Sequence, residues 1–129
     1  MAKVLVWATG LFFVLYGAAF IAFPMEMATL ITDDSPSTPS GLIDFRATYG
    51  GMSIAVGVTI LILAARAESI QLSLLVTGIV LFGMAIGRGL GIVLDGSPNI
   101  IMVIYLGAEL VFGGLAFLLR SKIGREGKP

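Results

Sequence analysis

The chain has 129 residues, of which 57% are hydrophobic and only 12% charged, and its formal net charge is zero. Soluble domains typically carry about 25% charged residues, and a small globule buries too little surface to hide this excess of apolar side chains. The composition therefore favours a membrane protein, and the neutral balance indicates no nucleic-acid partner. Cysteine and histidine are absent. Their absence excludes disulfides, thiol nucleophiles, thiolate zinc sites and His-dependent triads, and we expect no metal or cofactor.

The first apolar run covers residues 4–23, between Lys3 and Pro24. The apolar region of a signal peptide spans only about 7–15 residues, whereas this run has 20, so we expect a retained membrane helix. A polar outer loop over residues 24–41 follows. We expect a short interfacial helix over 24–31 with Pro24 at its first position, and then a turn-rich segment over 33–41.

Three further apolar runs cover residues 42–65, 72–94 and 100–119. Each has the length of about 20 residues that a spanning helix requires. In the turn before the last run, Gly96 suits a left-handed helix cap, Ser97 an N-cap and Pro98 the first helical position. The sequence therefore predicts an all-α, four-helix transmembrane bundle with up-down-up-down topology in a single domain, 1–129, ending in a basic tail over 120–129.

The charges outside the four runs predict the orientation of the bundle. Basic residues flank the membrane at the N-terminus, in the second connection and in the tail, whereas the first and third connections are acidic. Because positively charged flanks stay inside, we expect both termini to be cytoplasmic in a multi-pass protein of the cell inner membrane.

Two opposite charges lie within the last two apolar runs, and an ionised group at this depth is normally paired or functional. At 1.5 Å per residue, Arg88 lies about 9 Å and Glu109 about 14 Å below the outer boundary. Side chains tilt toward the N-terminus of their own helix. On antiparallel neighbouring helices the two charged groups should therefore converge.

Arg46, Tyr49 and Tyr105 are placed in the same outer half and could join this pair, with Asp44 and Asp95 at the rim. Two arginines around one deep acid leave an excess of positive charge, which suits a carboxylate, a phosphate or a lipid headgroup. We therefore expect the ligand-binding residues to be Arg46, Tyr49, Arg88, Tyr105 and Glu109. The alternative is that the pair only fixes helix packing, that Arg46 extends to the interface and that the tyrosines form an aromatic belt.

Glycines provide a second pattern. Gly83, Gly87 and Gly91 recur every fourth residue, as in helices that approach each other closely. We expect this stripe to pack within the bundle rather than between subunits, and we expect Gly10 and Gly17 to serve the same purpose.

Several short motifs together are similar to one known family. The segments Arg46-Ala47-Thr48-Tyr49-Gly50-Gly51, Gly87-Arg88-Gly89 and Asp95-Gly96-Ser97-Pro98, followed by Glu109 and Arg120, resemble the bacterial domain-of-unknown-function family 4345 in order and spacing. The resemblance implies a small four-helix membrane protein whose distinctive polar positions are Arg46, Arg88, Asp95 and Glu109. It supplies no activity. A likeness to the DoxX-like proteins concerns architecture only.

Three functions are open on this sequence. The first is binding of a small anionic amphiphile or membrane lipid in an outer-half pocket, which we favour. The second is a structural role in a homo-oligomer or as an accessory subunit of a larger membrane complex. The third is a membrane isomerase or hydrolase with Glu109 as acid or base, although the sequence has no second deep carboxylate and no activated nucleophile.

Overall fold

The computed structural model describes residues 1–126, and every regular element in that range is helical. Four of its helices are long and apolar enough to cross a membrane, as the sequence predicts. The elements are, in order, α1 (Ala2–Ala22), α2 (Pro24–Thr32), α3 (Pro39–Phe45), the π-helix η1 (Arg46–Gly51), α4 (Met52–Ala65), the 3₁₀ turn η2 (Ala67–Ser69), α5 (Ile70–Asp95) and α6 (Ile100–Glu126). The last three residues of the predicted basic tail lie outside the described residues.

Capping residues explain where two helices begin. α3 starts three residues before the predicted span because the Thr38 hydroxyl accepts the Gly41 N–H at 3.1 Å and Pro39 occupies the first turn. At α6 the predicted Ser97 cap is wrong. Ser97 has a φ of +37°, whereas an N-cap needs extended backbone. The cap is instead Asn99, whose Oδ1 accepts the Met102 N–H at 2.9 Å.

The Asn99 side chain also joins two distant parts of the chain. Its Nδ2 donates to the Ile31 carbonyl at 2.9 Å and to Asp33 Oδ2 at 2.8 Å, which fixes the start of α6 against the end of α2. At its other end α6 continues to Glu126, past the predicted limit at residue 119, and Ile123 in this extension packs against the apolar core that contains Leu5 and Val6.

Glycine pairs hold α1 against the helix formed by η1 and α4. A Cβ on Gly57 would lie 2.6 Å from the Gly10 carbonyl oxygen, and one on Gly17 would lie 2.5 Å from that of Gly50. Each pair allows the two backbones to touch, and the pairs are seven residues, or about two turns, apart. The predicted close packing at Gly10 and Gly17 is confirmed.

The second pair of helices, α5 and α6, uses other glycines than predicted. A Cβ on Gly113 would lie 2.8 Å from the Phe82 ring, and a Cβ on Gly78 would lie 2.8 Å from the Phe117 ring. A Cβ on Gly83 or Gly87 would meet no atom within 4 Å. The predicted packing of Gly83 and Gly87 within the bundle is therefore wrong: these two glycines lie on the outer surface of α5, away from the face that buries Leu81 and Ala85.

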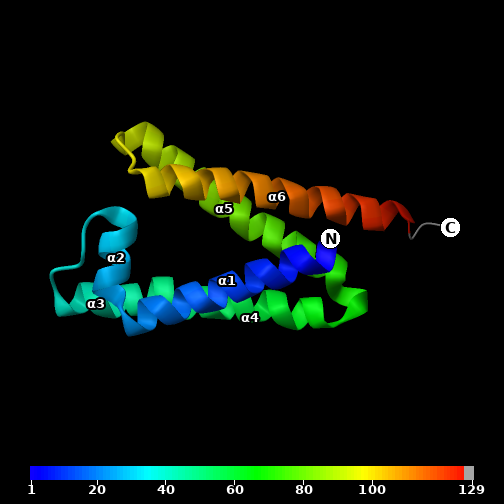
Figure 1. Cartoon of the computed structure of the whole chain (residues 1–129), viewed down its shortest axis with the longest axis horizontal. Coiled ribbons are helices and arrows are strands. Elements are labelled where there is room, and N and C mark those ends of the chain that lie inside the picture. The colour runs from blue at the N-terminus through cyan, green and yellow to red at the C-terminus, as the bar shows by residue number, and fades with distance from the viewer. Residues whose placement is uncertain (127–129) are drawn as a thin grey trace.

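The two helix pairs diverge along the bundle (Figure 1). Near the N-terminus and the end of α6, which we name the terminal end, they share one apolar core that includes Leu5, Phe13, Ile60, Leu74 and Ala116. At the opposite end, which we name the loop end, α2 lies between them. Its Ala28 and Ile31 form a second core with Phe20 of α1, flanked by Tyr16, Tyr105 and Met102.

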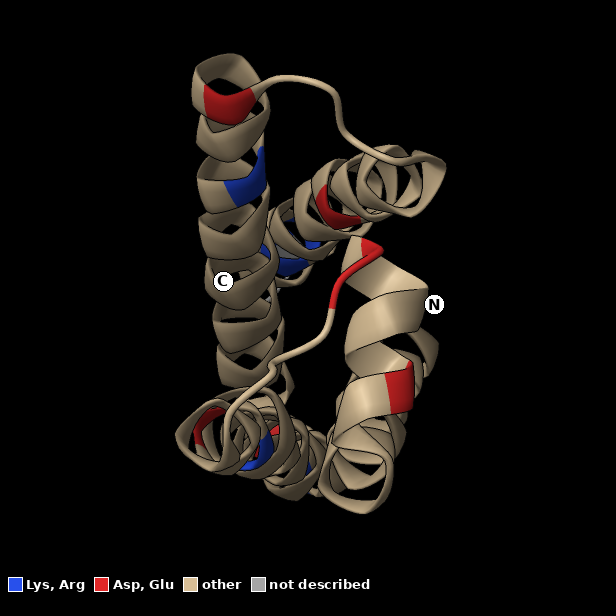
Figure 2. Cartoon of the chain, turned by 90° about the vertical axis from the view of Figure 1, so that its left-hand side faces the viewer, with Lys and Arg blue, Asp and Glu red and all other residues tan. Residues whose placement is uncertain are grey.

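Charge is divided between the two ends. The loop-end segments carry five acids and one base: Glu26, Asp33, Asp34, Asp44, Asp95 and Arg46. Acidic segments accordingly dominate the elements nearest the viewer in Figure 2, which looks onto the loop end. The terminal end carries the five bases Lys3, Arg66, Arg120, Lys122 and Arg125 together with the acid Glu68.

Candidate ligand pocket at the Arg88–Glu109 pair

Arg88 of α5 and Glu109 of α6 form a two-pronged ion pair, which confirms the predicted convergence. Arg88 Nη2 donates to Glu109 Oε1 at 2.7 Å, and Nε donates to Oε1 at 3.2 Å and Oε2 at 3.1 Å. The two side chains are only 16% and 6% exposed. Both planar groups are thus matched edge to edge, the geometry in which arginine binds carboxylates most strongly.

Neighbouring residues of α6 complete the surroundings of Arg88. Tyr105 lies one turn before Glu109, and its ring centroid is 5.3 Å from the Arg88 guanidinium carbon, within cation–π range. Met102 lies two turns before Glu109, and its Sδ accepts from Arg88 Nη1 at 2.8 Å. The spacing of three and four residues places these side chains on one face of α6.

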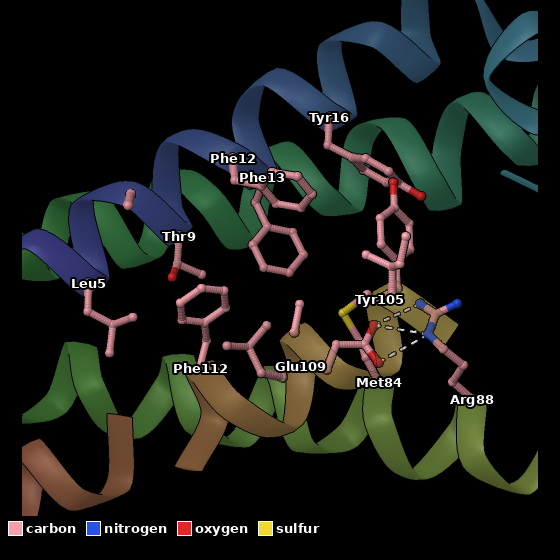
Figure 3. A pocket seen from close by; sticks show the side chains of 14 residues that line it. Leu5, Thr9, Phe12, Phe13, Tyr16, Met84, Arg88, Tyr105, Glu109 and Phe112 are labelled. Carbon is pink, nitrogen blue, oxygen red and sulfur yellow. Dashed lines mark hydrogen bonds and ion pairs between the residues drawn. The ribbon is translucent and has the colours of Figure 1, made fainter. Parts of the chain in front are cut away.

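A pocket of about 370 Å³ lies between α1 on one side and α5 and α6 on the other, within the usual size range of small-molecule sites. Arg88, Glu109, Tyr16 and Tyr105 form its loop-end part, whereas the rest is almost entirely apolar (Figure 3). The apolar lining comprises Leu5, Ala8, Phe12, Phe13, Leu81, Met84, Ile104, Ala108 and Phe112, with the Thr9 hydroxyl as the one further polar group.

The α1 wall of this pocket is the part that sequence reasoning missed. Leu5, Thr9, Phe12 and Tyr16 follow each other at spacings of four, three and four, which places them on one helix face. That spacing was a readable signal. In an evenly apolar helix, however, it does not show which face meets lipid and which meets protein.

The pocket reaches the side surface of the bundle. The most exposed of its large lining residues are Phe12 at 51%, Ile104 at 59% and Phe112 at 47%. They come from α1 and α6, so the opening lies between these two helices. At the loop end, by contrast, Tyr16 and Tyr105 pack against the core formed with α2, which covers the pocket there.

A second, smaller pocket of about 250 Å³ lies beyond Arg88 at the loop end. Its lining comprises Arg88, Gly91, Ile92, Asp95, Gly96, Pro98 and Met102. Arg88 is the one residue shared with the larger pocket. The arginine therefore separates an apolar chamber from a chamber near the polar connection between α5 and α6.

Two of the five predicted ligand-binding residues are placed elsewhere. Arg46 is exposed and lines neither pocket. The helix formed by η1 and α4 packs against α1 through Gly50 and Gly57, and none of its described residues lines either pocket. The wider π turns of η1 also put Arg46 about one residue, or roughly 100°, out of register with these glycines. Tyr49 is 42% exposed and stacks on Phe20 at 5.2 Å.

Without Arg46, the expected excess of positive charge in the larger pocket is not present, since Arg88 and Glu109 balance each other. Of the two predicted rim acids, Asp95 lines the smaller pocket. Asp44 is exposed and accepts a hydrogen bond from the Thr48 hydroxyl at 3.2 Å.

Comparison with known proteins adds a family but no activity. No curated protein and no solved structure matches the chain. A family model described as "Domain of unknown function (DUF4345)" matches residues 1–120, nearly the whole chain, and the protein therefore belongs to this family.

Proposed function

We propose that the protein binds a small amphiphile or single-chain lipid, with its hydrocarbon part in the larger pocket and its polar group at Arg88 and Glu109. The observation that carries this proposal is the division of the pocket. One end holds a buried ion pair and two tyrosines, and the remainder is lined by apolar side chains apart from Thr9. An amphiphile has the same division of polarity.

The opening between α1 and α6 supports entry from the membrane. Phe12, Ile104 and Phe112 would face acyl chains in a bilayer, so a lipid could move sideways into the pocket without crossing water. The cover formed by α2 at the loop end favours the same route.

The hydrogen bonds of Arg88 indicate which polar group fits. A guanidinium has five N–H donors, and among the described residues Nε, Nη1 and Nη2 each use one. Two donors are left for a ligand oxygen, such as that of a phosphate or carboxylate. Because Glu109 already balances the arginine, an anionic head would gain from close contact with these donors rather than from a net positive pocket.

For the location we propose a bacterial inner membrane, with both termini cytoplasmic and the ion pair in the outer half of the bilayer. The support is the basic terminal end and the acidic loop end, which match the rule that positive flanks stay inside.

The test is native mass spectrometry of the detergent-released protein, with and without added lysophospholipid. We expect one bound lipid per chain, lost in Ala8→Phe, because residue 8 lines the pocket. The matched control is Ala18→Phe, which adds the same ring to an exposed position of α1 outside both pockets. Equal lipid retention by both variants would refute the proposal.

A second candidate is the role of accessory subunit. The observation in its favour is the open surface at Gly83 and Gly87, where another helix could approach closely. The same mass spectra would show a second copy or a co-isolated protein, and a stable monomer would count against this role. The enzyme alternative gains no support, because Glu109 is the only carboxylate among residues 1–126 that lines the larger pocket.

A further inference from the structure

We infer that the ligand carries a zwitterionic head, with an anionic group on Arg88 and an ammonium group on Asp95 in the smaller pocket. The inference rests on the proposed function and adds the chemical class of the head. It assigns a binding role to the smaller pocket, which the hydrocarbon part of a ligand would not use.

Asp95 is an acid in a position that disfavours it. It is the last residue of α5, where the carbonyl end of the helix dipole is negative and stabilises cations instead. The one ion pair among the described residues is Arg88–Glu109, so the Asp95 carboxylate has no basic partner within that part of the chain. A ligand cation would meet both the carboxylate and the end of the dipole.

The space between the two charges is open because of a glycine. Arg88, Gly91 and Asp95 are spaced by three and four residues on one face of α5, and all three line the smaller pocket. A Cβ on Gly91 would lie 3.8 Å from Asp95 Oδ2, and no other atom is within 4 Å. Because residue 91 has no side chain, the space between Arg88 and Asp95 is left open for a ligand group.

The charge balance distinguishes a zwitterion from simpler heads. Arg88, Glu109 and Asp95 together carry +1 −1 −1, or −1, so the combined site does not favour a purely anionic ligand. A purely cationic head would leave the two remaining Arg88 donors unused. One of these is the second N–H of Nη1, the nitrogen that already donates to Met102, and Met102 lines the smaller pocket. A head in which an amine follows a phosphate or carboxylate would bind Arg88 through its anionic group and Asp95 through its ammonium group.

The experiment compares lysophospholipids that share one acyl chain and differ in the head, bound to the full chain in detergent. We expect lysophosphatidylethanolamine to bind more tightly than lysophosphatidic acid or monoacylglycerol. Asp95→Asn should weaken binding of the ethanolamine lipid about fivefold, the scale of one partly exposed ion pair, and should leave lysophosphatidic acid unchanged or tighter. Glu26→Gln removes an exposed acid of the same end outside both pockets and should change neither.

The outcomes separate this inference from the proposed function. If the lipids bind and Ala8→Phe removes them, but Asp95→Asn affects all heads alike, the zwitterionic head is refuted and the amphiphile pocket stands. If no lipid binds, the proposed function fails first. Free phosphoethanolamine tests the source of the head group: competition at equal concentration would show a soluble zwitterion, and absence of competition would support a lipid.

Discussion

The ion pair allows its two charges to be removed separately and together. The variants are Arg88→Met, Glu109→Leu and the double replacement, each of which keeps a side chain of similar bulk. In the wild type, two N–H groups of Arg88 bind the Glu109 carboxylate. Hydrogen bonds to charged groups contribute roughly 1.5–3 kcal/mol each, so losing both bonds while the partner charge stays buried would cost about 3–6 kcal/mol.

Removal of one partner leaves the other charge buried, and this penalty decides the result. We expect each single variant to lose about 3–5 kcal/mol of the free energy of unfolding. The double variant should lie within about 1 kcal/mol of the wild type or above it, because it also avoids the desolvation of two ions. From these values, the interaction energy of the double-mutant cycle should be about 5 kcal/mol or more.

The assay is reversible unfolding by SDS in mixed micelles, followed by circular dichroism, on all four proteins. A double variant as unstable as the single ones would refute the reasoning, since the charges would not be compensating each other. Lysophospholipid binding by the same proteins then separates the two roles of the pair. A stable double variant that no longer binds lipid supports a ligand site, and one that binds as the wild type does would make the pair purely structural.

Other residues give independent tests. Gly57→Ala should destabilise the protein by about 1–3 kcal/mol, because the new Cβ would overlap backbone atoms of α1. Gly87→Ala should be neutral or stabilising, because its Cβ would meet open space. Equal effects of the two variants in the same SDS unfolding assay would contradict the glycine contacts. Asn99→Ala removes the α6 cap and the bonds to α2 and should cost about 1–2 kcal/mol, so a variant of wild-type stability would argue against the cap. The chain has no cysteine, and a membrane-impermeant maleimide should therefore label Ser37→Cys in intact cells and Ser121→Cys only after lysis. The reverse pattern would overturn the proposed orientation.

Much of this architecture could be predicted from the sequence because hydropathy and length determine it. Four apolar runs gave four helices, and depth counting on antiparallel neighbours brought Arg88 to Glu109. The first argument uses only the hydropathy and length of each run, and the second uses only the regular rise of an α-helix. They required no knowledge of how the helix pairs are placed against each other.

The rest depended on contacts between distant parts of the chain. Arg46 shares a face with Gly50 only if the helix is regular, and the π turn of η1 removes that condition. Glycine spacing alone could not distinguish the stripe at Gly83 and Gly87, which meets nothing, from the pair at Gly10 and Gly57, whose backbones touch. Asn99 was overlooked as a cap because Ser97 and Pro98 suggested an earlier start of α6, and its bonds to Ile31 and Asp33 join segments that are far apart in the sequence.

The two glycine contacts between α1 and the η1–α4 helix have a mechanical consequence. They join these helices at two levels, while the ion pair and the phenylalanines join α5 to α6. The larger pocket lies between the two units, so its width depends on the angle at which they are inclined. Because bilayer thickness acts on helix tilt, a thinner or thicker membrane would change that angle and, with it, the width of hydrocarbon chain that the proposed lipid site would accept.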